Sequence, residues 1–148
     1  MSDRFLDARG VTRSFGTTAA LRGADIGVAA GEILALMGPS GSGKSTLLHC
    51  LAGILTPDDG EVWFDGARLD RLDDRARTAL RRQRFGFVFQ FGQLVPELPA
   101  VENVALPLLL DGRPRGRALS AATPWFERLG LAGLENRRPG ELSGGETQ

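Results

Sequence analysis

The chain has 148 residues, and its 18 basic and 18 acidic residues cancel to a formal net charge of +0 at pH 7. This balance gives no general attraction to nucleic acid or to an anionic membrane, so we do not expect a nucleic-acid partner. The single cysteine excludes an internal disulfide framework and is typical of a reducing compartment. The stretch 105–110 is too short and too interrupted by Pro107 to span a bilayer, and no signal-peptide pattern begins the chain. We therefore expect a soluble, cytoplasmic protein.

The first ninety residues alternate between short apolar runs and turn residues, which is typical of strands. The predicted strands are 5–15, 20–29, 33–37, 61–64 and 85–89. The first two are expected to form a hairpin around Gly16, and Asp65-Gly66 is a two-residue hairpin signal. The apolar runs 33–37 and 85–89 predict buried strands. Helices are predicted over 45–52 and 73–84.

The pattern changes at about residue 91, beyond which no convincing strand is found. Apolar clusters at 101–110 and 117–131 favour helices. Pro124 interrupts the second cluster, so we expect a new helix there, with Thr123 as its N-cap and Pro124 at its first position. The sequence thus predicts an α/β lobe over 1–90 and a helical lobe over 91–148.

A glycine-rich segment after the predicted strand 33–37 matches the Walker A pattern G-x-x-x-x-G-K-[ST] with Gly38, Gly43, Lys44 and Ser45. The glycines let successive backbone N–H groups point into one concavity, and the helix that begins there adds its positive end. Lys44 supplies charge for the β- and γ-phosphates, and the Ser45 hydroxyl is placed to bind Mg²⁺. Lys44 is also the only lysine among the 18 basic residues. A glycine-rich turn without a ligand is the alternative, but the strand–loop–helix context favours a nucleotide-phosphate site.

The last residues contain the run Leu-Ser-Gly-Gly-Glu, in which Ser143 and Glu146 have the spacing of a capping box. Taken alone, this run is a flexible loop. Taken with the Walker A pattern and with Gln90 at the end of a predicted strand between them, it resembles the signature of the ATP-binding cassette (ABC) family of P-loop ATPases. The resemblance covers about residues 5–148.

The resemblance implies an α/β P-loop NTPase core with an N-terminal antiparallel β region and a helical subdomain. It implies ATP and Mg²⁺ as cofactors, with Phe15 stacked on the adenine and Gln90 contacting Mg²⁺ and the attacking water. The signature would close on the γ-phosphate of ATP held by a second subunit. The residues assigned to ATP are Phe15, Gly38, Ser40, Gly41, Ser42, Gly43, Lys44, Ser45, Thr46, Ser143, Gly144 and Gly145; Ser45 and Gln90 are assigned to the metal ion, and Lys44 and Gln90 to catalysis. For Phe15, the alternative is an ordinary core aromatic.

The stretch 85–104, with Phe-Gly-Phe-Val-Phe-Gln-Phe and Val-Glu-Asn-Val, narrows the resemblance to cassettes paired with lipoprotein-release and macrolide-export permeases. This implies a head-to-tail ATPase dimer, a membrane permease that determines substrate and direction, and a peripheral location at the inner face of the plasma membrane. A non-transport ABC ATPase acting on nucleic acid or ribosomes is the alternative, and a P-loop kinase is a second. A GTPase is excluded, since its N-K-x-D motif needs another lysine.

The family carries a Walker B strand with a general-base glutamate, and then a switch histidine, after the signature. Residues 1–148 contain no counterpart of either, so we expect a fold incomplete at its C-terminus, only marginally stable, that binds ATP without hydrolysing it. His49 and Cys50 are interpreted as structural. We interpret the arginines of the predicted helix 73–84 and the segment before it as a solvated face; they are at positions 71, 75, 77, 81, 82 and 84.

Overall fold

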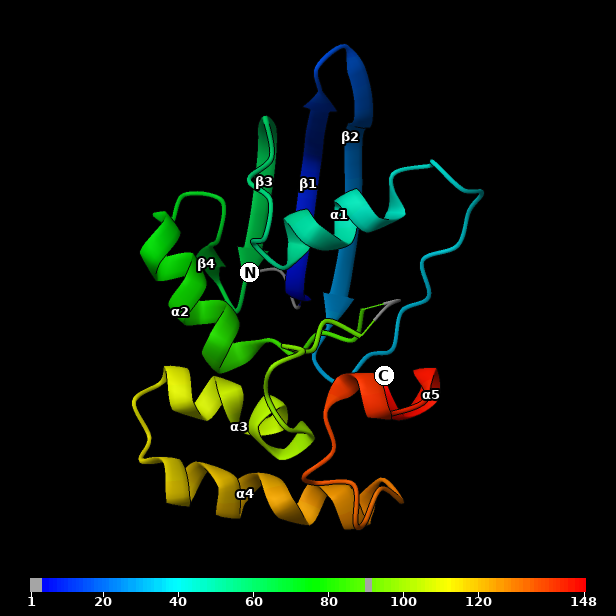
Figure 1. Ribbon diagram of the computed structural model, residues 1–148. Helices are drawn as coiled ribbons and strands as arrows, with labels where there is room; N and C mark the ends of the chain where they lie inside the picture. Colours follow the sequence, from blue (N-terminus) through cyan, green and yellow to red (C-terminus); the bar gives the residue numbers. More distant parts are fainter. Residues whose placement is uncertain (1–3, 90–91) are drawn as a thin grey trace. The chain divides into compact units, whose positions relative to one another are not determined.

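The computed structural model describes residues 4–89 and 92–148 (Figure 1). The chain divides into two compact units, Met1–Gly86 and Phe87–Gln148, and each is described by itself. Within the described residues, every helix is too short or too polar to cross a membrane.

The first unit contains a four-stranded antiparallel sheet in the order β2-β1-β3-β4 (Figure 1). Its strands are β1 (Arg4–Phe15), β2 (Thr18–Ala29), β3 (Asp59–Phe64) and β4 (Ala67–Arg68). The predicted hairpin of the first two strands is confirmed, with Phe15 paired to Thr18. The predicted Asp65-Gly66 turn is confirmed as well: φ is 49° and 78° at these residues, and two successive positive values are what a type I′ hairpin requires.

Helix α1 (Lys44–Leu51) packs on this sheet, and α2 (Asp74–Arg84) follows β4, so both predicted helices are confirmed. Asp73 caps α2, because its Oδ1 accepts a 2.7 Å hydrogen bond from the Ala76 amide. The core joins α1 to the sheet through a cluster of buried side chains: Ala8, Val11, Leu21, Leu47, Cys50, Leu51, Val62, Phe64 and Leu69. Cys50 is fully buried there, in agreement with its structural interpretation, and burial raises the pKa of its thiol.

The two predicted buried strands at 33–37 and 85–89 are wrong. Neither segment is a strand, and Ile33, Met37 and Val88 are 98%, 87% and 85% exposed. An apolar run becomes a strand only when a neighbouring strand pairs with its backbone, and the described part of the chain supplies no such neighbour. Leu36 and Phe85 pack against the core of the first unit.

The second unit is helical, with α3 (Ala100–Leu110), α4 (Arg115–Arg128), the 3₁₀ turn η1 (Pro139–Glu141) and α5 (Gly144–Thr147). Facing α3 and α4 bury the cluster Ala100, Val101, Ala105, Ala118, Ala122 and Phe126. The prediction that a new helix begins at Pro124 is wrong. The buried stripe Ala118–Ala122–Phe126 repeats every four residues across this proline, so packing holds one continuous helix. Thr123 is no cap; its hydroxyl donates to the Leu119 carbonyl, 3.0 Å away.

Asn103 of α3 organises the segment that precedes this helix. Its Oδ1 accepts from the Val95 amide at 2.7 Å, and its Nδ2 donates to the carbonyls of Val95, Leu98 and Pro99 at 3.1, 3.0 and 3.2 Å. One side chain therefore bonds to four backbone groups of the segment 95–99.

A buried carboxylate, Asp7, lies on β1 and is only 2% exposed. Arg4 Nη1 donates to its Oδ1 at 3.0 Å, and Arg9 Nε donates to its Oδ2 at 2.8 Å. Burial raises the pKa of Asp7, but the hydrogen bonds and charges of the two arginines outweigh this effect and lower it. The carboxylate is therefore held in its charged form.

This lowered pKa predicts how the stability of the fold depends on pH. A carboxyl whose pKa falls on folding stabilises the fold above its unfolded pKa of about 3.9, and this contribution is lost as the pH drops through the lower folded value. We expect Asp7→Asn to lower the free energy of unfolding by about 1–3 kcal/mol at neutral pH. The difference from wild type should shrink below about pH 3.9 in urea titrations. A difference that stays constant with pH would contradict this account.

Candidate nucleotide-binding site

The glycine-rich loop runs from Gly38 into α1 and curls back on itself. The Ser42 amide donates to the Pro39 carbonyl at 3.3 Å, and Gly43 is the N-cap of α1 with a φ of 88°. Its own carbonyl accepts the first helical hydrogen bond, from Leu47 at 2.8 Å. The amides at the start of α1 are thus left for an anion, which is the arrangement that binds phosphate.

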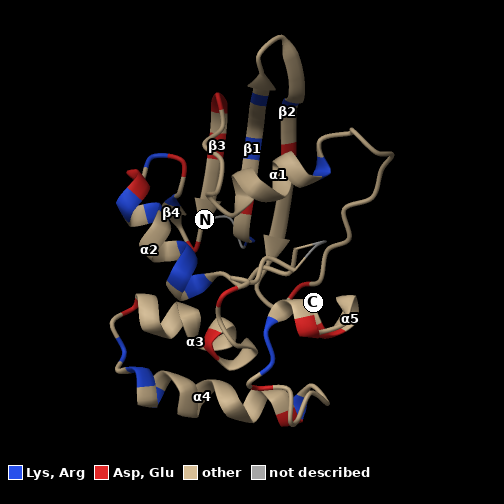
Figure 2. Cartoon of the chain, viewed as in Figure 1, with Lys and Arg blue, Asp and Glu red and all other residues tan. Residues whose placement is uncertain are grey.

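Lys44 is the first residue of α1, and its ammonium lies in this loop. Its Nζ donates to the carbonyls of Gly38 and Pro39 at 2.8 and 2.6 Å and to Ser42 Oγ at 3.3 Å. Figure 2 shows a basic segment at the start of α1 with the loop before it free of charge. Loop carbonyls are neutral partners, so a phosphate oxygen would be a stronger acceptor for the same ammonium.

Gly43 also approaches β2 closely. A Cβ built on it would lie 2.4 Å from the Ala20 carbonyl oxygen and 3.1 Å from a Leu21 methyl group. At Gly41, by contrast, φ is 78° but nothing lies within 4 Å of such a Cβ. Residues 19–24 of β2 and the loop residues Gly41 and Ser42 line a hollow of about 480 Å³. Within this loop and the first turn of α1, Ser40 and Ser45 are exposed and Thr46 is half-buried.

Phe15 ends β1 and is 49% exposed, so it is not a core aromatic. The guanidinium carbon of Arg13 lies 5.3 Å from the centre of its ring. A flat aromatic surface is therefore open to solvent on the unit that carries the loop.

The signature residues lie in the second unit. Ser143 caps α5, and the predicted capping box is confirmed: the Ser143 amide donates to Glu146 Oε2 at 2.6 Å, and the Glu146 amide donates to Ser143 Oγ at 3.4 Å. The Ser143 amide holds the pKa of Glu146 below its ordinary value. Ser143, Gly144 and Gly145 are all exposed. Gln90 lies outside the described residues.

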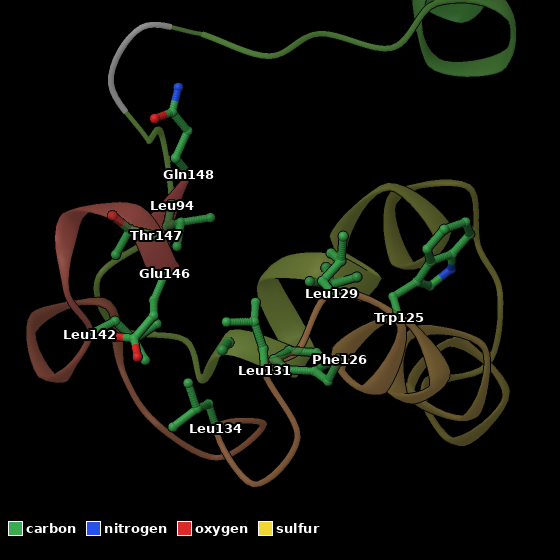
Figure 3. A pocket seen from close by; sticks show the side chains of 12 residues that line it. Leu94, Trp125, Phe126, Leu129, Leu131, Leu134, Leu142, Glu146, Thr147 and Gln148 are labelled. Carbon is green, nitrogen blue, oxygen red and sulfur yellow. The ribbon is translucent and has the colours of Figure 1, made fainter.

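The predicted site residues are divided between the two units. The loop 38–46 and Phe15 belong to the first unit, and Ser143–Gly145 belong to the second. The second unit also has an apolar pocket of about 310 Å³ beside α5, lined by Leu94, Trp125, Leu129, Leu131 and neighbouring side chains (Figure 3). Its only charged lining residue is Glu146, so it has no chemistry for phosphate. His49 belongs to no metal-binding cluster in the described part of the chain.

Comparison with known proteins decides the family. The sequence profile of the family described as ABC transporter matches residues 21–148. The chain belongs to this family. This ABC chain is 49% identical over 152 aligned residues to a protein of Maricaulis maris, the lipoprotein-releasing system ATP-binding protein LolD. The alignment covers all of this chain and 66% of the relative. The chain is 45% identical to LolD 2 of Caulobacter vibrioides, and this alignment covers 100% of this chain and 67% of the relative.

Solved structures agree with the ABC fold. The ATP-binding cassette MJ0796, in a dimeric post-hydrolysis state bound to ADP and Pi, matches with a TM-score of 0.86 at 35% identity. A second dimeric structure of the same cassette matches with a TM-score of 0.88. Each match covers 96% of this chain and 65% of the MJ0796 chain, so the sequence spans about two thirds of the length of its relatives. The ABC ATPase fold predicted from the sequence is confirmed.

Sequence reasoning missed the side chains around Phe15. Arg13 pairs with Asp58, which is 45 residues further along the chain, and no periodic spacing connects the two. The sequence shows Pro57-Asp58-Asp59-Gly60 only as a turn cluster, which hides the side-chain role of Asp58.

Proposed function

We propose that this chain binds Mg·ATP through the loop 38–46 and serves as the ATP-binding part of an ABC transporter. The observation that carries the proposal is the position of Lys44, whose ammonium lies within the loop among acceptors that phosphate oxygens can replace. Membership of the ABC family makes ATP the expected nucleotide. Ser45 and Gln90 would hold Mg²⁺, which neutralises the phosphate charge.

In the working enzyme, two cassettes would bind two ATP molecules head to tail. The signature residues Ser143, Gly144 and Gly145 would contact the γ-phosphate bound by the partner cassette. Their exposure at the start of α5 is compatible with such a contact. The dimeric MJ0796 cassette bound to ADP and Pi supports this arrangement. Closure and hydrolysis would drive a membrane permease, with the cassette held at the inner face of the plasma membrane.

The relatives named for lipoprotein release support a permease of that type. Hydrolysis requires a general base that can reach the attacking water, and the family resemblance implies a glutamate of a Walker B strand in that role. The alternative, a non-transport ABC ATPase, predicts that the complete gene product co-purifies with ribosomes or nucleic acid. Transport predicts co-purification with a multi-span membrane protein.

The base-binding half of the proposal is tested at Phe15. If its exposed ring stacks on adenine, Phe15→Ala should raise the dissociation constant for Mg·ATP about 5- to 150-fold, because base–aromatic stacking contributes about 1–3 kcal/mol. Binding of Mg-tripolyphosphate, which has no base, should not change. Phe15→Tyr and Phe15→Trp keep the ring and should bind ATP as the wild type does. Unchanged ATP affinity in a folded Phe15→Ala protein would exclude stacking.

A further inference from the structure

The end of β1 is tied to the segment 56–58, which connects α1 to β3. Asp58 makes three of the four hydrogen bonds involved. Its amide donates to the Thr12 carbonyl at 2.9 Å, its Oδ1 accepts from Arg13 Nη1 at 2.6 Å, and its Oδ2 accepts from the Ser14 amide at 2.7 Å. Arg13 Nη1 also donates to the Thr56 carbonyl at 3.2 Å. We call Arg13 and Asp58 the clamp.

The clamp joins the end of β1, which carries Phe15, to the segment that leads back to α1. Phe15 follows Ser14 directly, and Ser14 is held by Asp58. The segment 56–58 follows α1, whose first residue is Lys44. The proposed function assigns the aromatic ring and the phosphate loop to the same ligand. They are linked by the hydrogen bond from Ser14 to Asp58 and by the chain that runs from Asp58 back through α1.

The clamp also contacts the ring of Phe15. The Arg13 guanidinium lies over it at 5.3 Å while Phe15 remains 49% exposed, so an accessible part of the ring is left for a second flat group. Arg13 Nε is buried and has no hydrogen-bond partner in the described part of the chain. Buried polar groups are normally satisfied, but Arg13 leaves this donor unpaired while its Nη1 is held by Asp58 and Thr56.

We propose that Arg13 is a positioning residue, held by Asp58, which orients the Phe15 ring so that it can stack on the base of a bound nucleotide. This rests on the proposed function. Arg13 acts through the ring and does not itself contact ATP. The clamp should therefore affect ligands that have a base and leave the phosphate contacts of the loop unchanged.

The test compares Mg·ATP with Mg-tripolyphosphate as equilibrium ligands of the complete gene product. Arg13→Ala is expected to raise the dissociation constant for ATP about three- to tenfold and to leave tripolyphosphate within about twofold. Asp58→Asn keeps the shape of the side chain while removing its charge, and it should act in the same direction. Arg75→Ala removes an exposed arginine of α2 and serves as the matched control. Thermal unfolding of each variant checks that it is folded.

A double-mutant cycle distinguishes positioning from general stability. In a Phe15→Ala background, Arg13→Ala should change ATP affinity no further, because the ring it orients is gone. Equal losses for ATP and tripolyphosphate, or full additivity with Phe15→Ala, would overturn the proposal and leave the clamp as scaffolding. Failure of the proposed function looks different: Lys44→Ala would then bind tripolyphosphate as tightly as the wild type does.

Discussion

Lys44→Ala is expected to abolish ATP hydrolysis by the complete gene product and to weaken ATP binding strongly. The Lys44 ammonium is the only side-chain cation that the described loop 38–46 carries, and it is already held within the loop by two carbonyls. Removing a group that stabilises developing phosphate charge costs about 10²–10³ in rate. Phosphate release measured with Mg·ATP in excess tests this expectation.

The fold should survive the same substitution, because within the described residues the Lys44 ammonium bonds only to groups of its own loop. Its melting temperature should therefore stay close to that of the Arg75→Ala control. Lys44→Arg should not restore the rate, since a planar guanidinium cannot replace a compact ammonium in this loop. Near-normal hydrolysis by Lys44→Ala would exclude the loop as the phosphate site.

Gly43→Val is expected to destabilise the fold and to weaken nucleotide binding at the same time. Its φ of 88° disfavours any side chain, and a Cβ there would meet the Ala20 carbonyl oxygen at 2.4 Å, which is backbone and cannot rotate away. Either β2 or the start of α1 must move. We expect a loss of several kcal/mol in the free energy of unfolding, about the upper range for single substitutions, and loss of measurable ATP binding.

Gly41→Ala provides the comparison, since it has a similar φ of 78° but open space around its Cβ. It should cost only about 1–2 kcal/mol, which is the strain of the left-handed conformation itself. Urea unfolding and ATP titration of the two variants separate two effects: the contact of a new Cβ with β2, which only Gly43→Val makes, and the backbone strain, which both variants share. Similar losses at both positions would mean that contact with β2 is unimportant.

The features that the sequence predicts correctly are local. The β1–β2 hairpin, the Asp65-Gly66 turn and the helix that begins at Lys44 depend on neighbouring residues, whose conformational preferences are visible in the sequence. The capping box of Ser143 and Glu146 is local in the same sense. The Walker A pattern is also local, and its role as a phosphate site stays a prediction.

The features that the sequence does not predict depend on contacts between distant residues. Whether 33–37 forms a strand is decided by a partner strand, which an apolar run cannot specify. Pro124 stays within α4 because Ala122 and Phe126 are buried on the same face, so packing overrides the local signal of the proline. The pair of Arg13 and Asp58 became visible only when the fold brought β1 next to the segment after α1.

The central claim is that the loop 38–46 binds the phosphates of ATP, and equilibrium titration calorimetry tests it most directly. The complete gene product and its Lys44→Ala variant would each be titrated with Mg·ATP, Mg-tripolyphosphate and AMP. Our account predicts one site per chain for ATP, weaker binding of tripolyphosphate because Phe15 has no base to contact, little binding of AMP, and a large loss of the first two in Lys44→Ala. Equal binding of AMP and ATP, or ATP binding that Lys44→Ala leaves unchanged, would contradict it.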